Sequence, residues 1–208
     1  MSFVHIHIAG SKLTFRDVIP CVLNPNVRLR LVSKKDFAPL FRIIGSDPEG
    51  WREFSGGLTV KNARDLEDLL SFYREEDKIL PYVVETSDDN KRYTIVGLTS
   101  FDFWYKKDFE QRSEIYTSYL LAKRSRGTGM LQVITHTLLK TLLDMGLTPA
   151  RSVGTHNTPS WKACEHTGRL DRKLTEGGQT RGIFVVTKTE WTIVEKKLQD
   201  LYAQKHAR

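Results

Sequence analysis

The six residues from Arg124 to Gly129 have the composition of a phosphate-binding turn. They read Arg-Ser-Arg-Gly-Thr-Gly and connect residues 114–121, which predict a strand, to residues 130–145, whose apolar spacing predicts a helix. The first N–H groups of a helix have no partner inside the helix and carry a partial positive charge. Glycine lets the backbone approach a phosphate closely, and arginine adds charged donors. The turn therefore predicts an anion site, with a tight turn and solvated arginines as the alternative.

This turn differs from two common nucleotide-binding motifs. In a Gly-x-Gly-x-x-Gly fingerprint that begins at Gly127, the third glycine would fall on Gln132, and no parallel succession of strand and helix units follows. The turn also lacks the Gly-Lys-Ser/Thr of a P-loop. A pyrophosphate site outside both classes remains.

A second group of polar residues follows a segment, 150–155, that predicts a short strand. Asn157, Ser160, Glu165 and Gly168 have the spacing Asn-x-x-Ser-x-x-x-x-Glu-x-x-Gly, and the helix predicted at 159–166 carries two of them. A serine hydroxyl at a helix N-terminus can cap the helix or donate to a ligand. The spacing alone leaves both interpretations open.

Together the two groups resemble the GNAT superfamily of N-acetyltransferases. Its motif A, Gln/Arg-x-x-Gly-x-Gly/Ala at a strand-to-helix junction, is matched by residues 124–129. The group at 157–168 is similar to an element of the RimJ/RimL-like branch of ribosomal-protein acetyltransferases, in the family's order and at nearly its separation. The resemblance covers residues 27–191.

The resemblance implies a fold and a cosubstrate. The fold is a single α/β domain of the α+β type, with three α/β/α layers around a mixed, mostly antiparallel sheet whose fourth and fifth strands splay apart. The cosubstrate is acetyl-CoA, with its pyrophosphate on the turn and its pantothenate arm between the splayed strands. The cofactor-binding residues that the resemblance implies are Leu120, Leu121, Arg124, Arg126, Gly127, Thr128, Gly129, Met130 and Asn157.

Direct acetyl transfer to a primary amine needs a base for the amine and an acid for the departing thiolate. Glu114 stands at the family's acidic position at the start of the fourth strand, so we expect it to be the base, with a salt bridge near Arg112 as the alternative. Many family members have a tyrosine acid where this sequence has Cys164. The RimJ/RimL-like branch implicates a serine at the position of Ser160, which we expect to be the acid. We expect Cys164 to be a core residue rather than an acyl carrier.

The acceptor amine stays open between a small molecule and a protein N-terminus. Trp51, after Pro48 in a glycine-rich loop, is expected to line its pocket, whereas Phe101 and Phe103 are expected to fill the core and Trp104 could do either. The alternative function is a non-catalytic module that binds CoA or a protein, because the usual tyrosine is missing and the segment after Gly168 is short for the family.

Composition narrows the class of protein. The net charge of +7 favours polyanionic partners, but the basic residues form no single dense run, so nucleic acid is not the expected partner. No apolar run approaches membrane-spanning length, and the first ten residues lack the pattern of a signal peptide. The two cysteines are far apart in the sequence, so we expect no disulfide and a cytoplasmic protein. His5 and His7 are the only metal-ligand candidates, and two ligands make no site, so we expect no bound metal. A homodimer is possible.

The elements that must position these residues follow from hydrophobic spacing and breaker residues. Residues 1–26 are expected to form an N-terminal extension packed on the domain, residues 27–191 the acetyltransferase domain, and residues 192–208 a C-terminal helix. The expected strands are 27–31, 80–85, 93–104, 114–121 and 150–155, with a final hairpin over 174–188. The expected helices are 33–45, one after Lys61, 130–145, 159–166 and 191–204.

Overall fold

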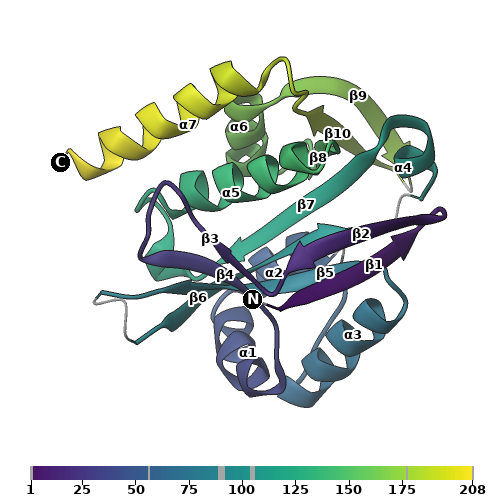
Figure 1. Ribbon diagram of the computed structural model, residues 1–208. Helices are drawn as coiled ribbons and strands as arrows, with labels where there is room; N and C mark the ends of the chain where they lie inside the picture. The colour runs from purple at the N-terminus through teal and green to yellow at the C-terminus, as the bar shows by residue number, and fades with distance from the viewer. Residues whose placement is uncertain (1, 56, 89–91, 104–105, 177, 208) are drawn as a thin grey trace.

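The computed structural model describes residues 2–55, 57–88, 92–103, 106–176 and 178–207. These form a two-stranded sheet, β1-β2, and an eight-stranded sheet in the order β3-β4-β5-β6-β7-β8-β10-β9 (Figure 1). The strands are β1 Phe3–Ile8, β2 Ser11–Arg16, β3 Val18–Pro20, β4 Val27–Leu31, β5 Ile79–Thr86, β6 Thr94–Asp102, β7 Glu114–Leu121, β8 Thr148–Gly154, β9 Arg169–Glu176 and β10 Gln179–Val185. The helices are α1 Phe37–Gly45, α2 Pro48–Ser55, α3 Ala63–Glu75, α4 Lys106–Arg112, α5 Met130–Asp144, α6 Thr158–Thr167 and α7 Trp191–His206, with short 3-10 turns η1 Lys34–Asp36 and η2 Lys123–Ser125.

Helices cover both faces of the large sheet, so the expected three-layer fold is confirmed (Figure 1). Leu98 of β6 and Val83 of β5 pack against α1 and α3 on one face. Phe101 and Leu80 point to the other face, where α5 contributes Val133 to the same core. α7 packs on the outside of α5. All strand pairs of the large sheet are antiparallel except β7 with β8.

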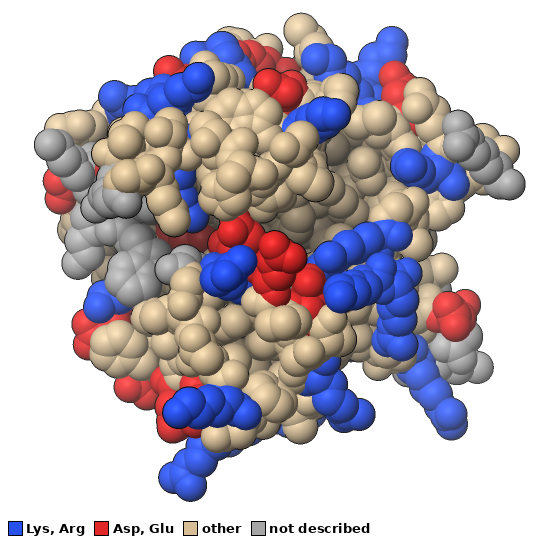
Figure 2. Space-filling view, turned by 180° about the vertical axis from the view of Figure 1, so that it is seen from behind, with Lys and Arg blue, Asp and Glu red and all other residues tan. Residues whose placement is uncertain are grey.

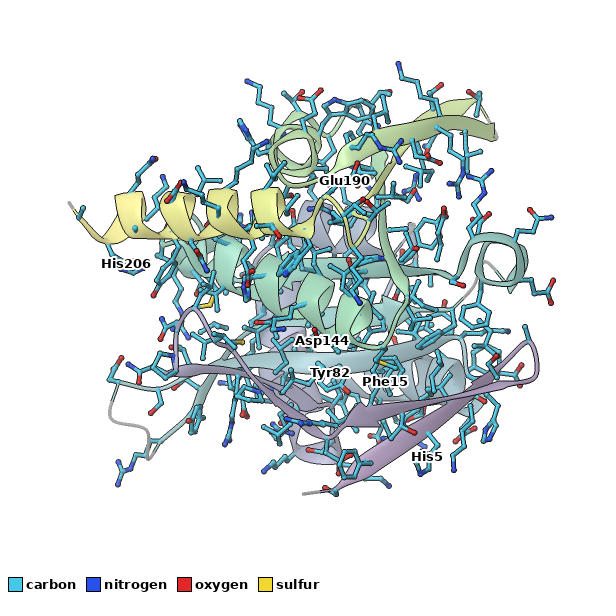
Figure 3. All side chains as sticks on the ribbon, turned by 45° about the horizontal axis from the view of Figure 1, so that its top comes forward. His5, Phe15, Tyr82, Asp144, Glu190 and His206 are labelled. Atoms are coloured by element: carbon cyan, nitrogen blue, oxygen red, sulfur yellow. The ribbon has the colours of Figure 1, made fainter. Side chains whose placement is uncertain are left out.

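The N-terminal hairpin packs on the same face of the sheet as α5. Ile6 and Phe15 alternate inward with buried side chains, as a half-buried strand pair requires. The ring of Phe15 lies 4.9 Å from that of Phe101, and the hydroxyl of Tyr82 donates to the carbonyl of Arg16 at 2.8 Å. Figure 3 labels Phe15 on the hairpin and Tyr82 on the sheet. Burial and this long-range hydrogen bond attach the hairpin to the sheet.

Several element predictions are confirmed, and others are wrong. Strands 27–31 and 114–121 have the predicted bounds, and the helix that begins at Met130 ends at Asp144. The loop expected around Trp51 is instead α2, a helix that starts with proline at a position where its missing N–H costs nothing. α4 was not predicted, because its seven residues are too few to show a helical period.

The last hairpin starts earlier than predicted. β9 begins at Arg169 instead of residue 174, and its register with β10 runs from Arg169 opposite Val185 to Glu176 opposite Gln179. β9 is an edge strand that has two exposed leucines, Leu170 and Leu174, among mostly charged residues. Such a strand lacks the alternation of buried and exposed positions that identifies strands in a sequence.

The described residues include no membrane-crossing helix and no metal cluster. None of their helices is both long enough and apolar enough to cross a membrane. Among them, no three His, Cys, Asp or Glu side chains gather as ligands of a metal ion would. His5 lies on the exposed side of β1, with its ring nitrogen 3.0 Å from the hydroxyl of Thr14.

Candidate active site

The sheet opens between its two parallel strands. β7 and β8 pair over only three residues, from Glu114 opposite Thr148 to Tyr116 opposite Ala150. Beyond these residues the segments 117–121 of β7 and 151–154 of β8 do not pair with each other, and a cavity of about 1320 Å³ lies between them. α2, α6 and the turn at 126–129 complete the walls. The splay that the family resemblance implied is therefore present.

The turn at the wide end of this opening has the form expected of an anion site. Gly127 and Gly129 have φ angles of +76° and +85°, which residues other than glycine rarely adopt. Both glycines line the cavity. No acceptor is found within the described residues for the backbone N–H groups of residues 127–131, at the start of α5. The hydroxyl of Thr128 closes the turn by donating to the carbonyl of Ser125 at 2.9 Å.

The two arginines of the turn have different surroundings. Arg126 lines the cavity and donates to the carboxylate of Asp47 and to the carbonyl of Leu121. Burial alone would raise the pKa of Asp47, but the hydrogen bond from Arg126 lowers it below its ordinary value. Arg124 is exposed and does not line the cavity. Arg126 thus joins the turn to the start of α2, which the sequence did not predict.

The motif at 157–168 places one hydroxyl in the cavity. Asn157 is the N-cap of α6, because its side-chain oxygen accepts the backbone N–H of Ser160 at 3.2 Å. Ser160 therefore is not the cap, and its side chain lines the cavity. Glu165 accepts the indole N–H of Trp161 at 2.8 Å, one helical turn away. Helix capping explains Asn157 in part, while Ser160 remains available to a ligand.

A phenol lies beside Ser160 and Cys164. Burial is the main reason that the pKa of Tyr119, on β7, is raised, while a hydrogen bond with Ser160 lowers it in part. Burial also raises the pKa of the Cys164 thiol, which packs against Val153 in the core as expected. The sequence analysis missed Tyr119, because it reaches this place from a different strand.

Glu114 lies in an ion pair. Its carboxylate is 4% exposed and accepts two hydrogen bonds from Arg172, at 3.0 and 2.6 Å. Arg112 approaches it at 3.9 Å, so the salt-bridge alternative describes its surroundings. Arg172 also donates to Tyr116, whose hydroxyl donates to Asp108. Glu114 is not among the described residues that line the cavity.

A carboxylate that does line the cavity is Asp102, at the end of β6. It accepts the hydroxyl of Ser100 at 2.6 Å and that of Ser118 at 2.9 Å, and the two serine oxygens lie 2.6 Å apart. All three residues line the cavity. Burial raises the pKa of Asp102 to about 6, although both hydroxyls act in the opposite direction. The sequence analysis missed this group, although small polar residues that alternate in a strand covered on both faces are a usable signal.

Charges around the cavity are separated by element. The acidic residues come from α2 and its start and from β6, and the basic residues come from the turn and the segments after it. The acidic lining residues are Asp47, Glu49, Glu53 and Asp102, and the basic ones are Arg126, Arg151, His156, Arg181 and Lys205. On the face seen in Figure 2, acidic side chains gather beside the central hollow, with basic side chains to the right of it.

The predicted aromatic residues divide between core and cavity. Trp51 is buried in the core of α1, α2 and α3, lines the cavity as well, and donates its indole N–H to the carbonyl of Leu58 at 2.8 Å. Phe101 and Phe103 fill the opposite core, as expected. Trp104 lies outside the described residues.

Comparison with known proteins supports the fold through structure alone. No family model matches this sequence. No curated protein matches it either.

Three solved structures with a similar fold are acetyltransferases. A probable GNAT-family acetyltransferase from Chromobacterium violaceum has 16% identity and a TM-score of 0.72, over 91% of this chain and 92% of its own. Mycobacterium smegmatis RimJ in complex with CoA-disulfide has 17% identity and a TM-score of 0.68, over 86% and 89%. Spermidine N-acetyltransferase from Vibrio cholerae, in complex with CoA and spermine, has 14% identity and a TM-score of 0.63, over 81% and 99%. The chain therefore has the fold of the GNAT acetyltransferases.

Proposed function

We propose that this chain is an acetyl-CoA-dependent N-acetyltransferase that transfers the acetyl group directly to a primary amine. The observation that carries the proposal is the parting of β7 and β8, which opens a long cavity with the N-terminus of α5 at its wide end. A long ligand with a phosphorylated end fits this arrangement, because unpaired N–H groups stand at one end and strand edges along the rest. The similar RimJ structure is a complex with CoA-disulfide, and the similar spermidine acetyltransferase structure is a complex with CoA and spermine.

The cofactor would lie along the basic side of the cavity. The N–H groups of residues 127–131 would hold the pyrophosphate, and exposed Arg124 would add charge from outside. Leu120 and Leu121, both buried in the cavity wall, would contact the pantothenate arm. The amide nitrogen of Asn157 would donate to that arm, since its oxygen already caps α6. This assignment places the thioester between β7 and α6.

The departing thiolate would find its proton at Ser160. The Ser160 hydroxyl would donate, with the Tyr119 phenol as its hydrogen-bond partner, and the proton that the attacking nitrogen loses would restore the serine. Raised pKa values keep both the Tyr119 phenol and the Cys164 thiol protonated at neutral pH, because burial disfavours their anions. A protonated thiol is a poor nucleophile, so we propose direct transfer rather than an acyl-enzyme.

The acceptor would enter from the acidic side, along α2. Glu49 and Glu53 line the cavity there, so an amine that arrives as a cation meets favourable charge. A small polyamine and a protein N-terminus both satisfy this chemistry. We place the reaction in the cytoplasm, in line with the two free, buried cysteines Cys21 and Cys164.

Two matched glycine variants test the cofactor site. Gly127 and Gly146 stand just before and just after α5, both have φ of +76°, and both have nothing within 4 Å of an added Cβ. Gly127→Val and Gly146→Val therefore carry the same backbone strain, but only the first would obstruct a phosphate. Calorimetry should show acetyl-CoA binding weakened by about tenfold to a hundredfold in Gly127→Val, the cost of one or two charge-assisted hydrogen bonds, and nearly unchanged in Gly146→Val. Equal losses in the two variants would refute the site.

Turnover distinguishes an enzyme from a binding module. Wild-type protein, acetyl-CoA and a panel of primary amines should release CoA thiol, measured with a thiol reagent. Binding of acetyl-CoA without thiol release from any amine would instead establish the non-catalytic module, to which the missing tyrosine at Cys164 also points.

A further inference from the structure

Half-buried Asp102 differs from the fully buried carboxylates in having hydroxyl partners and no cationic one within the described residues. Among the residues that the structure describes, the donors to its two oxygens are Ser100 and Ser118. The buried carboxylates with an arginine partner are Asp36 and Glu85 with Arg30, Asp47 with Arg126, and Glu114 with Arg172. An arginine holds a carboxylate ionised and makes it a weak base, whereas burial with neutral donors leaves its affinity for a proton high.

The register of β6 and β7 places Asp102 at the far end of the cavity from the phosphate turn. Ser100 lies opposite Ser118, and Asp102 lies opposite Tyr116, where β7 and β8 meet again. Leu121, at the other end of β7, leads into the turn. At a rise of about 3.3 Å per residue, Ser118 lies about 10 Å and Tyr116 about 17 Å from Leu121 along the strand. A cofactor arm that starts at the turn therefore points its reactive end toward Asp102.

The neighbours of Asp102 fit a cationic substrate. Asp102 is on the face of β6 that also carries Leu98, which packs against α1 and α3. On this side the cavity is lined by aromatic and apolar residues of α2, α3 and β5, and by the two glutamates of α2. The basic lining residues come from the turn and later segments, where the anionic cofactor would lie. The acceptor thus meets a carboxylate, and the cofactor meets the cations.

From this arrangement we infer that Asp102 accepts the proton of the amine substrate, with Ser118 and Ser100 as positioning residues. The inference rests on the proposed function. An alkylammonium gives one proton to Asp102, which passes it to solvent, and the neutral amine attacks the acetyl carbon. The N–C bond forms and the C–S bond breaks. The thiolate takes a proton from Ser160, and the second proton of the attacking nitrogen replaces it, so that one proton is released per turnover.

Two phenols near Asp102 do not change charge in the acidic range. Tyr73 on α3 and Tyr116 on β7 line the same part of the cavity. Burial raises the pKa of Tyr73, and burial together with the hydrogen bond to Asp108 raises that of Tyr116, so both phenols stay protonated there. The carboxylates of Glu49 and Glu53 belong to α2, nearer the surface than Asp102.

The test is the pH profile of the full-length protein between about pH 5 and pH 9. CoA release is measured with spermidine and with a tripeptide amide that has a free α-amino group. In the wild type, kcat/KM should fall on the acidic side with a midpoint near the pKa of Asp102, about 6. Asp102→Asn should lower kcat/KM by about 100-fold or more and remove that acidic limb, while calorimetry shows unchanged acetyl-CoA affinity. Asp200→Asn, an exposed carboxylate on α7, should change neither.

A second variant keeps the test decisive if Asp102→Asn does not fold. Ser118→Ala removes one donor to the carboxylate, so the midpoint of the acidic limb should move to higher pH, with the plateau rate largely kept. An unchanged limb in Ser118→Ala, or wild-type kcat/KM in Asp102→Asn, would overturn the role of Asp102 and leave the acetyltransferase proposal standing. A wild type that binds acetyl-CoA but acetylates neither amine would overturn both.

Discussion

Replacing Asp102 with asparagine should change how the free energy of unfolding depends on pH, whatever the substrate. Burial raises the pKa of this carboxyl from 3.8 to about 6 in the folded protein. The folded state therefore binds the proton more tightly than the unfolded chain does. The resulting stabilisation is full below the unfolded pKa and is lost as pH rises through the folded one. At 1.36 kcal/mol per unit, the whole loss is about 3 kcal/mol.

The measurable part of this loss is smaller for two reasons. The lowest pH of the experiment lies above the unfolded pKa, and Asp102 is partly exposed to the cavity. We expect the wild type to lose about 1 to 2 kcal/mol relative to Asp102→Asn between about pH 4.5 and pH 7.5. Urea unfolding followed by tryptophan fluorescence gives this difference by linear extrapolation.

An opposite case serves as the control. Burial would raise the pKa of Glu85, but hydrogen bonds from Arg30 and Arg28 lower it, so its stabilisation is present above the unfolded pKa and is lost as pH falls. The wild type should therefore lose stability relative to Glu85→Gln toward acid and relative to Asp102→Asn toward neutral pH. Parallel pH curves for wild type and Asp102→Asn would refute the assignment of a buried, proton-binding carboxyl.

Two further substitutions test the frame of the site. Gly97→Ala should lower the free energy of unfolding by about 1 to 3 kcal/mol in the same urea assay. The added Cβ would lie 2.6 Å from the carbonyl oxygen of Leu120, a backbone atom with little room to move. An unchanged free energy of unfolding would show that β6 and β7 can separate there. Glu114→Gln should lower the free energy of unfolding by about 3 kcal/mol, because it leaves Arg172 without its main partner. Its kcat, measured with saturating amine, should fall far less than that of Asp102→Asn. A large loss of kcat with intact stability would restore Glu114 as the base.

The parts of the fold that the sequence predicts well are those defined by local pattern. One example is the segment from residue 114 to the helix that starts at Met130. Alternation identifies its strand, glycines identify its turn, and helical spacing identifies its helix. Helix α2 was not predicted, because its eight residues include Gly50 and few apolar positions. The first half of the edge strand β9 was not predicted, because too few of its side chains are buried to show an alternation of apolar and polar residues.

The candidate catalytic groups were harder to predict, since packing assembles them from distant segments. Tyr119 meets Ser160 only because β7 and α6 border the same opening, and Asp102 meets Ser118 only through the pairing of β6 with β7. The position of Glu114 at the start of β7 was predicted, but its partner Arg172 comes from β9, 58 residues later. A resemblance in one strand cannot reveal such a partner.

The difference between the two ends of the cavity has a physical cause. An anion needs N–H groups with no partner, and a strand, two glycines and a helix start provide them within one short segment, so the phosphate end is a local property. A carboxylate that must bind a proton near neutral pH needs burial, neutral donors and the exclusion of arginine, and none of these is a property of one segment. Asp102 obtains them from β6, β7 and the helices that cover that face. The residue types around Asp102 therefore acquire these properties only after the sheet has been assembled, at the end of the cavity where we propose that the acceptor binds.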